Sequence, residues 1–445
     1  MVEKNKTTVA RPVKHEAAPS SFRRLKGMKD VLPGDYPVWD FVLRTAFRLA
    51  DFHGFERVDT PVLENLSLYE RSSGRTSDIV TKEMYSFVDK SGDRIALRPE
   101  ATPGIVRSYI EHGWLNLPQP VKTLWYGPLF RHDKPQLGRY RQHHQINFDI
   151  FGEASPLADV QVIFLAHQIV SDLGIKAQVD INSLGCSDCR PNYINKLLAY
   201  YREKKHRDQL CQDCRKRLLK NPLRVLDCKE PACINVAREA PQMVDYLCDP
   251  CKQHFVKILE FLDGLSVPYN LNSQLVRGLD YYTRTVFELV VPSQTAERPL
   301  SLGGGGRYDQ LVEYLGGRPT PACGFALGVE RLILQLDENH VKVATSQDQP
   351  DIFLAQLGDG ARLKSLLLFE ELRQVGLTIR QSFTKDSLKA QLALASQVGA
   401  KYTLIIGQKE LLDGTILLRD MESGSQEVLD FKKVKTIMAK RLGKN

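Results

Sequence analysis

Residues 138–151 read Gly138-Arg139-Tyr140-Arg141-Gln142-His143-His144-Gln145-Ile146-Asn147-Phe148-Asp149-Ile150-Phe151. Every odd position from 139 to 149 is polar, whereas positions 146, 148 and 150 are apolar. Successive side chains of a strand point to opposite faces, so this pattern predicts a strand with one polar face. That face runs from arginines, which suit phosphates, through a flat ring to an amide and a carboxylate. The order favours a binding surface; the alternative is an ordinary solvated strand, although such strands are usually rich in Lys and Glu.

The residues before this strand predict its partner. Tyr126–Arg131 reads as an apolar strand that ends in a charge, and residues 132–138 form a polar loop. Together they predict a long hairpin with Arg131 at the base of its loop. Further outward, the chain shows strand patterns at 55–58, 83–88, 94–98 and 121–152 and helix patterns at 36–52 and 103–112. This order predicts an α+β fold, an antiparallel sheet flanked by helices.

The segment 97–103 places a carboxylate and a hydroxyl just before a predicted helix. Glu100 and Thr102 are suited to holding a polar ligand. A threonine before a proline at the first helical position is also typical of a helix cap, so capping is the alternative for Thr102.

The segment 275–288 begins with Arg277 beside a glycine and continues as a β-rich run. Backbone can approach a ligand closely at that glycine. Because strand residues alternate between faces, only one of Tyr281 and Tyr282 is expected to face the same cavity.

A run of four glycines at 303–306 precedes Arg307 and Tyr308. No Lys-Ser or Lys-Thr follows, so the run is not a P-loop. We interpret the glycines as leaving room where the sheet meets its substrate, with Arg307 and Tyr308 at the rim.

The segment 324–332 has the spacing of a helix, with Gly324, Gly328 and Arg331 on one stripe. Two glycines would let such a helix lie close to the sheet. Arg331 would then reach the sheet surface, where a cation needs an anion beside it.

Eight of the nine cysteines lie between residues 186 and 251, and three of the four pairs have CxxC spacing. Their thiols could form up to two tetrahedral zinc sites. The alternatives are reduced thiols and redox-labile pairs. Cys323 stands apart as a small core residue. The candidate ligands are Cys186, Cys189, Cys211, Cys214, Cys228, Cys233, Cys248 and Cys251.

The chain has 445 residues and a mass of 50.4 kDa, which suggests two to four domains. Its net charge of +8 fits a polyanion partner without requiring one. The composition and the first residues predict a cytoplasmic protein with neither a membrane span nor a signal peptide. We expect a disordered tail (1–22; a transit peptide is the alternative), a discontinuous core (23–185 and 265–337), a helical Cys-rich insert (186–264), a linker (338–349) and an α/β module (350–445).

These motifs resemble those of the histidyl-tRNA synthetases, a family of class II aminoacyl-tRNA synthetases. The resemblance covers nearly the whole chain after residue 22 and is most specific over 277–288, around Arg131 and over 324–331. It implies a class II catalytic sheet, an insert over the tRNA acceptor stem and a C-terminal anticodon-binding domain. It further implies ATP, Mg²⁺, L-histidine and tRNA(His) as ligands, and a homodimer with Pro61 at its interface.

The resemblance also implies a role for each site residue. Arg131 and Arg277 would hold the α-phosphate of ATP and act in catalysis. Arg139 and Arg331 would hold the distal phosphates, and His143 would stack on adenine. Glu100, Thr102 and Gln145 would hold the α-ammonium group of histidine; Asp149 and Tyr282 would bind the imidazole, Tyr308 would close the pocket, and Lys134 and Gln136 would meet the tRNA acceptor end.

Two residues depart from the commonest family pattern, which has phenylalanine at position 143 and glutamate at position 149. If His143 stacks on adenine, the affinity for ATP could depend on pH. The shorter carboxylate of Asp149 could shift the position of the bound imidazole. The rival functions are a non-catalytic paralogue, such as the regulatory subunit of ATP phosphoribosyltransferase, a stress-sensing tRNA-binding module and a generic RNA-binding protein.

Overall fold

The computed structural model describes residues 22–74, 77, 79–292, 300–341, 343 and 349–444. Two compact units divide the chain between Val343 and Ala344. The predicted tail, apart from residue 22, lies outside the described residues, as does much of the predicted linker. Within the described part of the chain, no helix is long and apolar enough to cross a membrane.

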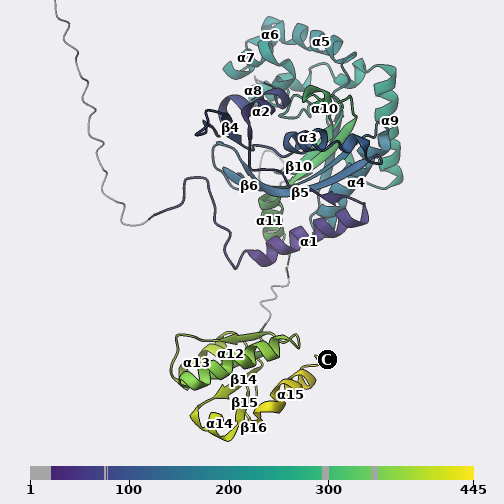
Figure 1. Cartoon of the computed structure of the whole chain (residues 1–445). Helices are drawn as coiled ribbons and strands as arrows, with labels where there is room; N and C mark the ends of the chain where they lie inside the picture. The colour runs from purple at the N-terminus through teal and green to yellow at the C-terminus, as the bar shows by residue number, and fades with distance from the viewer. Residues whose placement is uncertain are drawn as a thin grey trace, which may run out of the picture. The chain divides into compact units, whose positions relative to one another are not determined.

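An eight-stranded sheet forms the centre of the first unit (Figure 1). Its order is β1-β5-β6-β11-β10-β9-β7-β8, and every pair is antiparallel except β1–β5 and β7–β8. The strands are β1 (Glu56–Arg57), β5 (Val121–Phe130), β6 (Gln142–Phe151), β7 (Gln178–Ser183), β8 (Tyr269–Leu271), β9 (Thr283–Val291), β10 (Leu300–Arg307) and β11 (Ala322–Gly328). The predicted α+β fold with an antiparallel sheet is confirmed.

Strand β6 covers residues 142–151, and its two faces pack against different parts of the protein. Ile146, Phe148 and Ile150 lie in the larger hydrophobic core, with residues of α1 (Tyr36–Phe52), α4 (Pro156–Asp172) and α11 (Val329–Glu338). The alternation of residues 145–150 therefore turns one face to the helices. The opposite face is left for His143, Gln145, Asn147 and Asp149, as predicted. The prediction is wrong for Arg139 and Arg141, which precede the strand because β6 begins at Gln142.

A second hydrophobic cluster lies on the polar side of the sheet. It joins α3 (Thr102–Glu111) to the pocket tyrosines and to the insert helices. A small sheet of β2 (Leu63–Asn65), β4 (Arg94–Leu97) and β3 (Ser86–Val88), with α2 (Leu66–Ser72), brings Glu100 to the edge of this region. The short helix α10 (Leu311–Tyr314) packs against α3.

The Cys-rich segment is helical, as predicted. It contains α5 (Arg190–Arg202), α6 (Lys204–Arg207), α7 (Gln212–Lys220), α8 (Pro231–Arg238) and α9 (Asp249–Gly264), and the first three lie at the top of Figure 1. Helix α9 packs on α4 and buries Phe255, Ile258 and Leu262 in the larger core. This last helix therefore anchors the segment to the sheet.

The second unit is a five-stranded sheet with helices, in the order β13-β12-β14-β15-β16. The first three strands are parallel and the last two antiparallel. Strands 352–356 and 402–406 form at the predicted residues. The elements are β12 (Ile352–Gln356), α12 (Asp359–Arg373), β13 (Ile379–Gln381), α13 (Leu388–Gln397), β14 (Tyr402–Ile406), α14 (Gln408–Asp413), β15 (Thr415–Asp420), β16 (Gln426–Asp430) and α15 (Val434–Arg441).

The predicted helix over 324–332 is wrong for its first half. Residues 322–328 form β11, between β6 and β10, and the helix begins only at Val329. A side chain at Gly324 would collide with the Phe148 carbonyl oxygen and the Asp149 carboxylate. The glycine thus allows close approach between strands, which a four-residue spacing cannot distinguish from a helix stripe.

Candidate active site

Arg331 lies in the first turn of α11 and points its guanidinium back to the sheet. Its Nε donates to the Gly138 carbonyl (3.2 Å) and one terminal nitrogen donates to the Ser301 carbonyl (2.7 Å). Burial lowers the pKa of Arg331, and the nearby charges of Arg139 and Arg131 lower it further. Positive charge is thus concentrated here, as an anion site requires.

The hairpin of β5 and β6 holds two more arginines of this group. Arg131 follows β5, and its Nε donates to the Pro99 carbonyl at 2.8 Å. Arg139 lies in the hairpin loop and pairs with Asp133, with 2.9 Å between nitrogen and oxygen. The backbone contact leaves the terminal nitrogens of Arg131 without a partner among the described residues.

Arg277 approaches the same region from the segment before β9. One terminal nitrogen pairs with Glu288 Oε1 at 2.8 Å, while its buried Nε has no partner within the described chain. A side chain at Gly304 would come within 3.1 Å of this guanidinium. Arg277 also lies 5.9 Å from the ring centre of Tyr282. Gly304 makes room first for strand β9, because a side chain there would lie 2.3 Å from the Phe287 carbonyl oxygen, nearer than the guanidinium.

His143 lies among these cations on β6. Burial, followed by the charges of Arg131 and Arg331, lowers its pKa to about 3. The ring is therefore neutral near pH 7, and its buried Nδ1 has no partner among described groups. A neutral flat ring suits stacking on a base. The hypothesis of a pH-dependent ATP affinity through His143 loses its basis, because no protonation is expected near neutral pH.

Asp149 lies near the other end of β6 and is 1% exposed. Its Oδ1 accepts hydrogen bonds from the Tyr308 hydroxyl and, at 3.4 Å, from the Thr102 hydroxyl. Its Oδ2 is buried without a partner in the described structure. Burial raises the pKa of Asp149 to about 7, although the hydrogen bonds oppose this rise and the charge of Glu100 adds to it. The free oxygen can accept a ligand N–H group.

Thr102 does not cap its helix. The N-terminal cap of α3 is Ala101, and the structure shows no side-chain cap hydrogen bond there. Thr102 instead donates to Asp149 and accepts from Asn147 Nδ2 at 3.4 Å. The capping alternative is therefore wrong, and Thr102 belongs to the pocket.

Glu100 supplies the second buried carboxylate of the pocket, at 4% exposure. Ser73 donates to its Oε1, and the Tyr281 hydroxyl donates to its Oε2 at 2.9 Å. Burial raises its pKa, opposed by these hydrogen bonds and by the charge of Arg131. An amino group bound here would compensate the buried charge.

Three tyrosines line this pocket. The rings of Tyr281 and Tyr282 lie 4.8 Å apart, and their centres lie 5.6 Å and 6.3 Å from that of Tyr308. The expectation that only one of Tyr281 and Tyr282 faces the cavity is wrong. Both precede β9, which begins at Thr283, so the alternation of a strand does not apply to them.

The remaining predicted site residues belong to the hairpin of β5 and β6. Gln145 is partly buried on β6, opposite Gly127 and Gly328, between His143 and Asp149 in the sequence. Lys134 and Gln136 are exposed in the hairpin loop.

Arg307 is not at the rim of the site. It is fully buried, pairs with Asp159 and Asp309, and donates to the carbonyls of Glu153 and Ser155. Tyr308 is likewise only 1% exposed. The rim prediction is wrong because the acidic partners of Arg307 come from α4 and from the following turn, which sequence spacing does not reveal.

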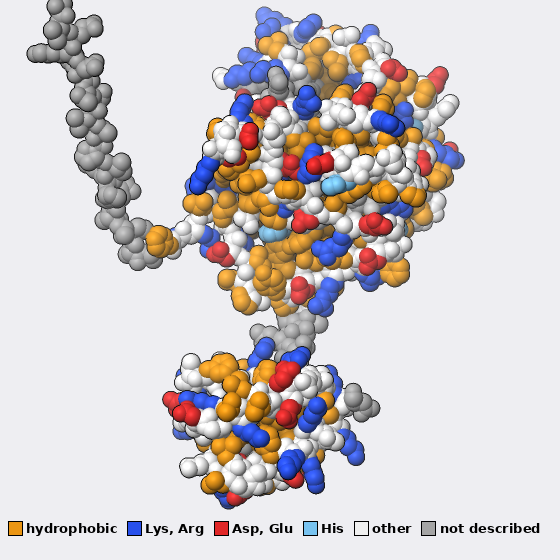
Figure 2. All heavy atoms as spheres, in the orientation of Figure 1, with side chains coloured by type: hydrophobic (Ala, Val, Ile, Leu, Met, Phe, Trp, Pro, Cys, Tyr) orange, Lys and Arg blue, Asp and Glu red, His pale blue; other side chains and the backbone are white. Residues whose placement is uncertain are grey.

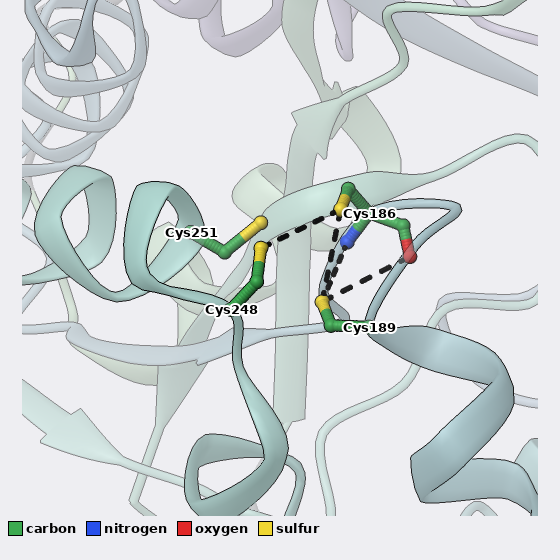
Figure 3. A group of neighbouring side chains, drawn as sticks. All are labelled: Cys186, Cys189, Cys248 and Cys251. Atoms are coloured by element: carbon green, nitrogen blue, oxygen red, sulfur yellow. Dashed lines mark hydrogen bonds between the residues drawn. The ribbon is translucent and has the colours of Figure 1, made fainter.

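The eight clustered cysteines form two groups of four. Cys186, Cys189, Cys248 and Cys251 bring their sulfurs together where the loop before α5 meets the start of α9 (Figure 3). The second group is Cys211, Cys214, Cys228 and Cys233. Cys323 is fully buried in the core, as predicted.

The Histidyl-tRNA synthetase model matches residues 27–332, and the Anticodon binding domain model matches residues 353–441. The chain belongs to the histidyl-tRNA synthetase family. The predicted family is therefore confirmed.

Individual relatives agree with this assignment. A histidine--tRNA ligase of Dehalococcoides mccartyi is 46% identical over 91% of this chain and 96% of its own, and one of Syntrophotalea carbinolica is 44% identical over 92% and 96%. The crystal structure of apo S. aureus histidyl-tRNA synthetase aligns with this structure at a TM-score of 0.77 and 31% sequence identity. The alignment covers 94% of this chain and 100% of the S. aureus chain.

Three contact residues were missed by the sequence reasoning. Ser73 and Tyr281 hold Glu100, and Glu288 holds Arg277. Tyr281 is next to the predicted site residue Tyr282, and Glu288 is the last residue of the segment 275–288, so both could have been predicted from their position in the sequence. Ser73 offers no comparable signal, because only folding brings α2 to the pocket.

Proposed function

We propose that the chain is a histidine–tRNA ligase. In this reaction the carboxylate of L-histidine attacks the α-phosphorus of ATP and expels pyrophosphate; the terminal ribose hydroxyl of tRNA(His) then attacks the adenylate carbonyl and AMP leaves. The curated relatives carry this activity in their names, and they confirm the predicted enzyme class, an aminoacyl-tRNA ligase.

One observation supports the choice of substrate most directly. Asp149 keeps one buried carboxylate oxygen without a partner in the described structure and contacts Tyr308 through the other, while four arginines gather near His143 at the other end of the strand. From His143 to Asp149 the strand spans roughly 20 Å at about 3.3 Å per residue. A basic heterocycle and a polyphosphate can thus bind at opposite ends.

Each residue then has a proposed role. The imidazole N–H donates to Asp149 Oδ2, beside Tyr282 and Tyr308. The α-ammonium group binds Glu100, Thr102 and Gln145. The adenine ring stacks on His143, and Arg139 and Arg331 hold the distal phosphates.

Arg131 and Arg277 hold the α-phosphate while its charge builds. No nucleophile from the enzyme is required, so catalysis depends on orientation and on fixed positive charge. Mg²⁺ supplies further charge neutralisation on the phosphates when ATP binds. Glu288 is the residue that we propose to hold it, because Oε2 has no partner in the described chain and Mg²⁺ prefers carboxylate and phosphate oxygens.

Two features support tRNA as the second substrate. The C-terminal unit matches an anticodon-binding domain. Figure 2 shows Lys and Arg side chains gathered at the top of the first unit, over α6 and α7. Lys134 and Gln136 in the hairpin loop are proposed to meet the acceptor end. Between residues 202 and 220 the exposed basic residues are Arg202, Lys204, Lys205, Arg207, Arg215, Lys216 and Lys220.

The remaining features of the proposal are a homodimer with Pro61 at its interface, a cytoplasmic location and the predicted core, insert and linker boundaries. None of the nine cysteines, all of which lie in the described residues, forms a disulfide, which fits a reducing compartment. Zinc is the proposed ligand of the eight clustered cysteines.

The test is ATP/pyrophosphate exchange by the purified chain with Mg²⁺ and each of the twenty amino acids. We expect exchange with histidine alone, and its loss in Arg277→Ala, followed by charging of tRNA(His). No exchange by a folded protein would refute the proposal. Histidine binding without exchange would favour the regulatory paralogue. One structural relative, from Bacillus halodurans C, is described as an ATP phosphoribosyltransferase regulatory subunit/histidyl-tRNA synthetase. It shares the fold, with a TM-score of 0.60 at 20% sequence identity.

A further inference from the structure

The two cysteine groups have the dimensions of tetrahedral metal sites. Four sulfurs at about 2.3 Å from one ion lie about 3.8 Å from each other in a tetrahedron. Cys186 Sγ lies 3.8 Å from both Cys189 Sγ and Cys248 Sγ, and Cys211 Sγ lies 3.9 Å from Cys228 Sγ. A disulfide would require about 2.05 Å. The spacing therefore fits a shared ion and excludes these pairs as disulfides in this structure.

Backbone N–H groups point to the sulfurs of both groups. In the first, the Cys186 amide donates to Cys189 Sγ at 3.3 Å and the Asp188 amide to Cys186 Sγ at 3.4 Å. In the second, the Cys211 amide donates to Cys233 Sγ at 3.2 Å. Such bonds favour the thiolate form, which is the form that binds metal.

Four thiolates within one group repel one another unless a cation lies between them. In each group the four Sγ atoms lie within 4.8 Å of one another, and five of the eight residues are buried. A closed set of four sulfurs selects zinc, or iron with sulfide, and leaves no open position for a substrate. An ion held by either group would therefore have a structural role.

We propose that the two groups hold one zinc ion each, and that these ions position the segment 277–284 of the active site. The first and last cysteine pairs in the sequence share one site, and the two middle pairs share the other. The metal sites stand independently of the proposed ligase function, while their effect on histidine binding rests on it.

The first site connects to the end of that segment. Arg190 directly follows Cys189, and its guanidinium donates to the carbonyls of Leu184 (3.0 Å) and Tyr282 (2.7 Å). The Arg284 amide donates to the Gly185 carbonyl at 2.8 Å, one residue before Cys186. An ion at this site thus fixes the loop that holds Tyr282.

The second site connects to the beginning of the segment. Residues 221–224 lie between Cys214 and Cys228, and Asn221 Nδ2 donates to Asp280 Oδ1 at 2.8 Å. One terminal nitrogen of Arg224 donates to the Arg277 carbonyl at 3.2 Å. The two sites therefore support the same segment from both ends, one through Arg277 and Asp280 and the other through Tyr282 and Arg284.

The test measures metal and kinetics on the full chain. Native mass spectrometry and elemental analysis of protein purified without chelator should give two zinc ions per chain. The variant Cys211→Ser with Cys214→Ser should retain one, as should Cys186→Ser with Cys189→Ser. The matched control Cys323→Ser changes the ninth cysteine, outside both groups, and should retain two.

In ATP/pyrophosphate exchange, each double variant should raise KM for histidine by about 10-fold or more, as lost support of a site commonly does. KM for ATP should change less, because Arg139 and Arg331 lie outside the supported segment. The variant Cys211→Ser with Cys214→Ser should also lower kcat, because its site supports Arg277. Should a double variant fail to fold, the unmodified chain expressed with Co²⁺ in place of Zn²⁺ should show the absorption of tetrahedral cobalt thiolates.

Active protein without zinc, iron with sulfide, or disulfides detected by alkylation and mass analysis would each overturn the metal assignment. Two zinc ions with an unchanged KM for histidine in both double variants would overturn the positioning role. A chain that holds two zinc ions but exchanges no pyrophosphate with histidine would refute the proposed function and leave the metal sites intact.

Discussion

Removing the hydroxyl of Tyr308 should shift the pH dependence of histidine activation. This hydroxyl donates to Asp149 Oδ1 inside a fully buried pocket, and it opposes the rise in pKa that burial causes. Asp149 must be ionised to accept an imidazole N–H. Tyr308→Phe removes the donor and leaves the burial unchanged, so the pKa of Asp149 should rise further.

The size of the shift follows from the contact. A hydrogen bond to a charged group contributes about 1.5–3 kcal/mol, and about 1.4 kcal/mol corresponds to one pKa unit, so the rise should be roughly 1–2 units. From a starting pKa of about 7, the ionised fraction at pH 7 should fall from about one half to between about one tenth and one hundredth. At pH 7, kcat/KM for histidine should fall by about 5- to 50-fold.

The assay is ATP/pyrophosphate exchange between about pH 5.5 and pH 9, with kcat/KM for histidine measured at each pH. Activity should decline below the pKa of Asp149, and this decline should begin at higher pH in the variant. The substrate imidazole titrates near pH 6.5 in both proteins, so only the difference between them reports on Asp149.

Tyr281→Phe is the matched control, because it removes a hydroxyl from the same ring cluster but one that donates to Glu100. This hydroxyl opposes the rise in the pKa of Glu100 instead, so the variant should weaken binding of the α-ammonium group while the hydrogen bond from Tyr308 to Asp149 stays in place. An acid limb that stays in place in Tyr308→Phe, with activity lowered equally at every pH, would refute the reasoning.

Three further predictions follow from the same contacts. Arg131→Ala and Arg277→Ala should each lower kcat of exchange by about 100- to 1000-fold, since each removes a cation from the developing charge; ordinary exchange rates in either variant would contradict its role. His143→Phe should leave KM for ATP within a few-fold and equally independent of pH between 6 and 8, because the ring is already neutral. A pH dependence of KM for ATP that the substitution removes would show that the His143 ring is protonated in this range. Asp159→Asn should lower the free energy of unfolding in urea by about 3–5 kcal/mol, because it leaves the buried charge of Arg307 without its main partner, and a loss below about 1 kcal/mol would show that the charge is compensated elsewhere.

The sequence predicts elements well where a single periodicity dominates. The helix at 36–52 and the strands at 352–356 and 402–406 form at the predicted residues. In each, local alternation and tertiary burial favour the same structure. The polar face of β6 was predictable for the same reason, because its even positions pack into the core beneath α4 and α11.

The errors occur where contacts distant in sequence decide the structure. Gly324 is spaced like a helix residue, yet its neighbours are β6 and β10. Arg307 is buried by a carboxylate 148 positions away. The two cysteine groups illustrate the same limit: CxxC spacing predicts metal ligands, but only the fold shows which pairs share a site.

The order of groups along β6 also gives the site a direction. Arg139 and Arg331 would attract a polyphosphate at one end, whereas Asp149 at the other end would repel it. Glu100 lies between them, near the charge of Arg131. The imidazole and ammonium groups of histidine have the reverse preference. With the proposed roles, charge would exclude each substrate from the other's place, and the two would meet between these ends, where the histidine carboxylate could attack the α-phosphorus. His143 fits this arrangement because a ring with a pKa of about 3 adds no charge to the cationic end.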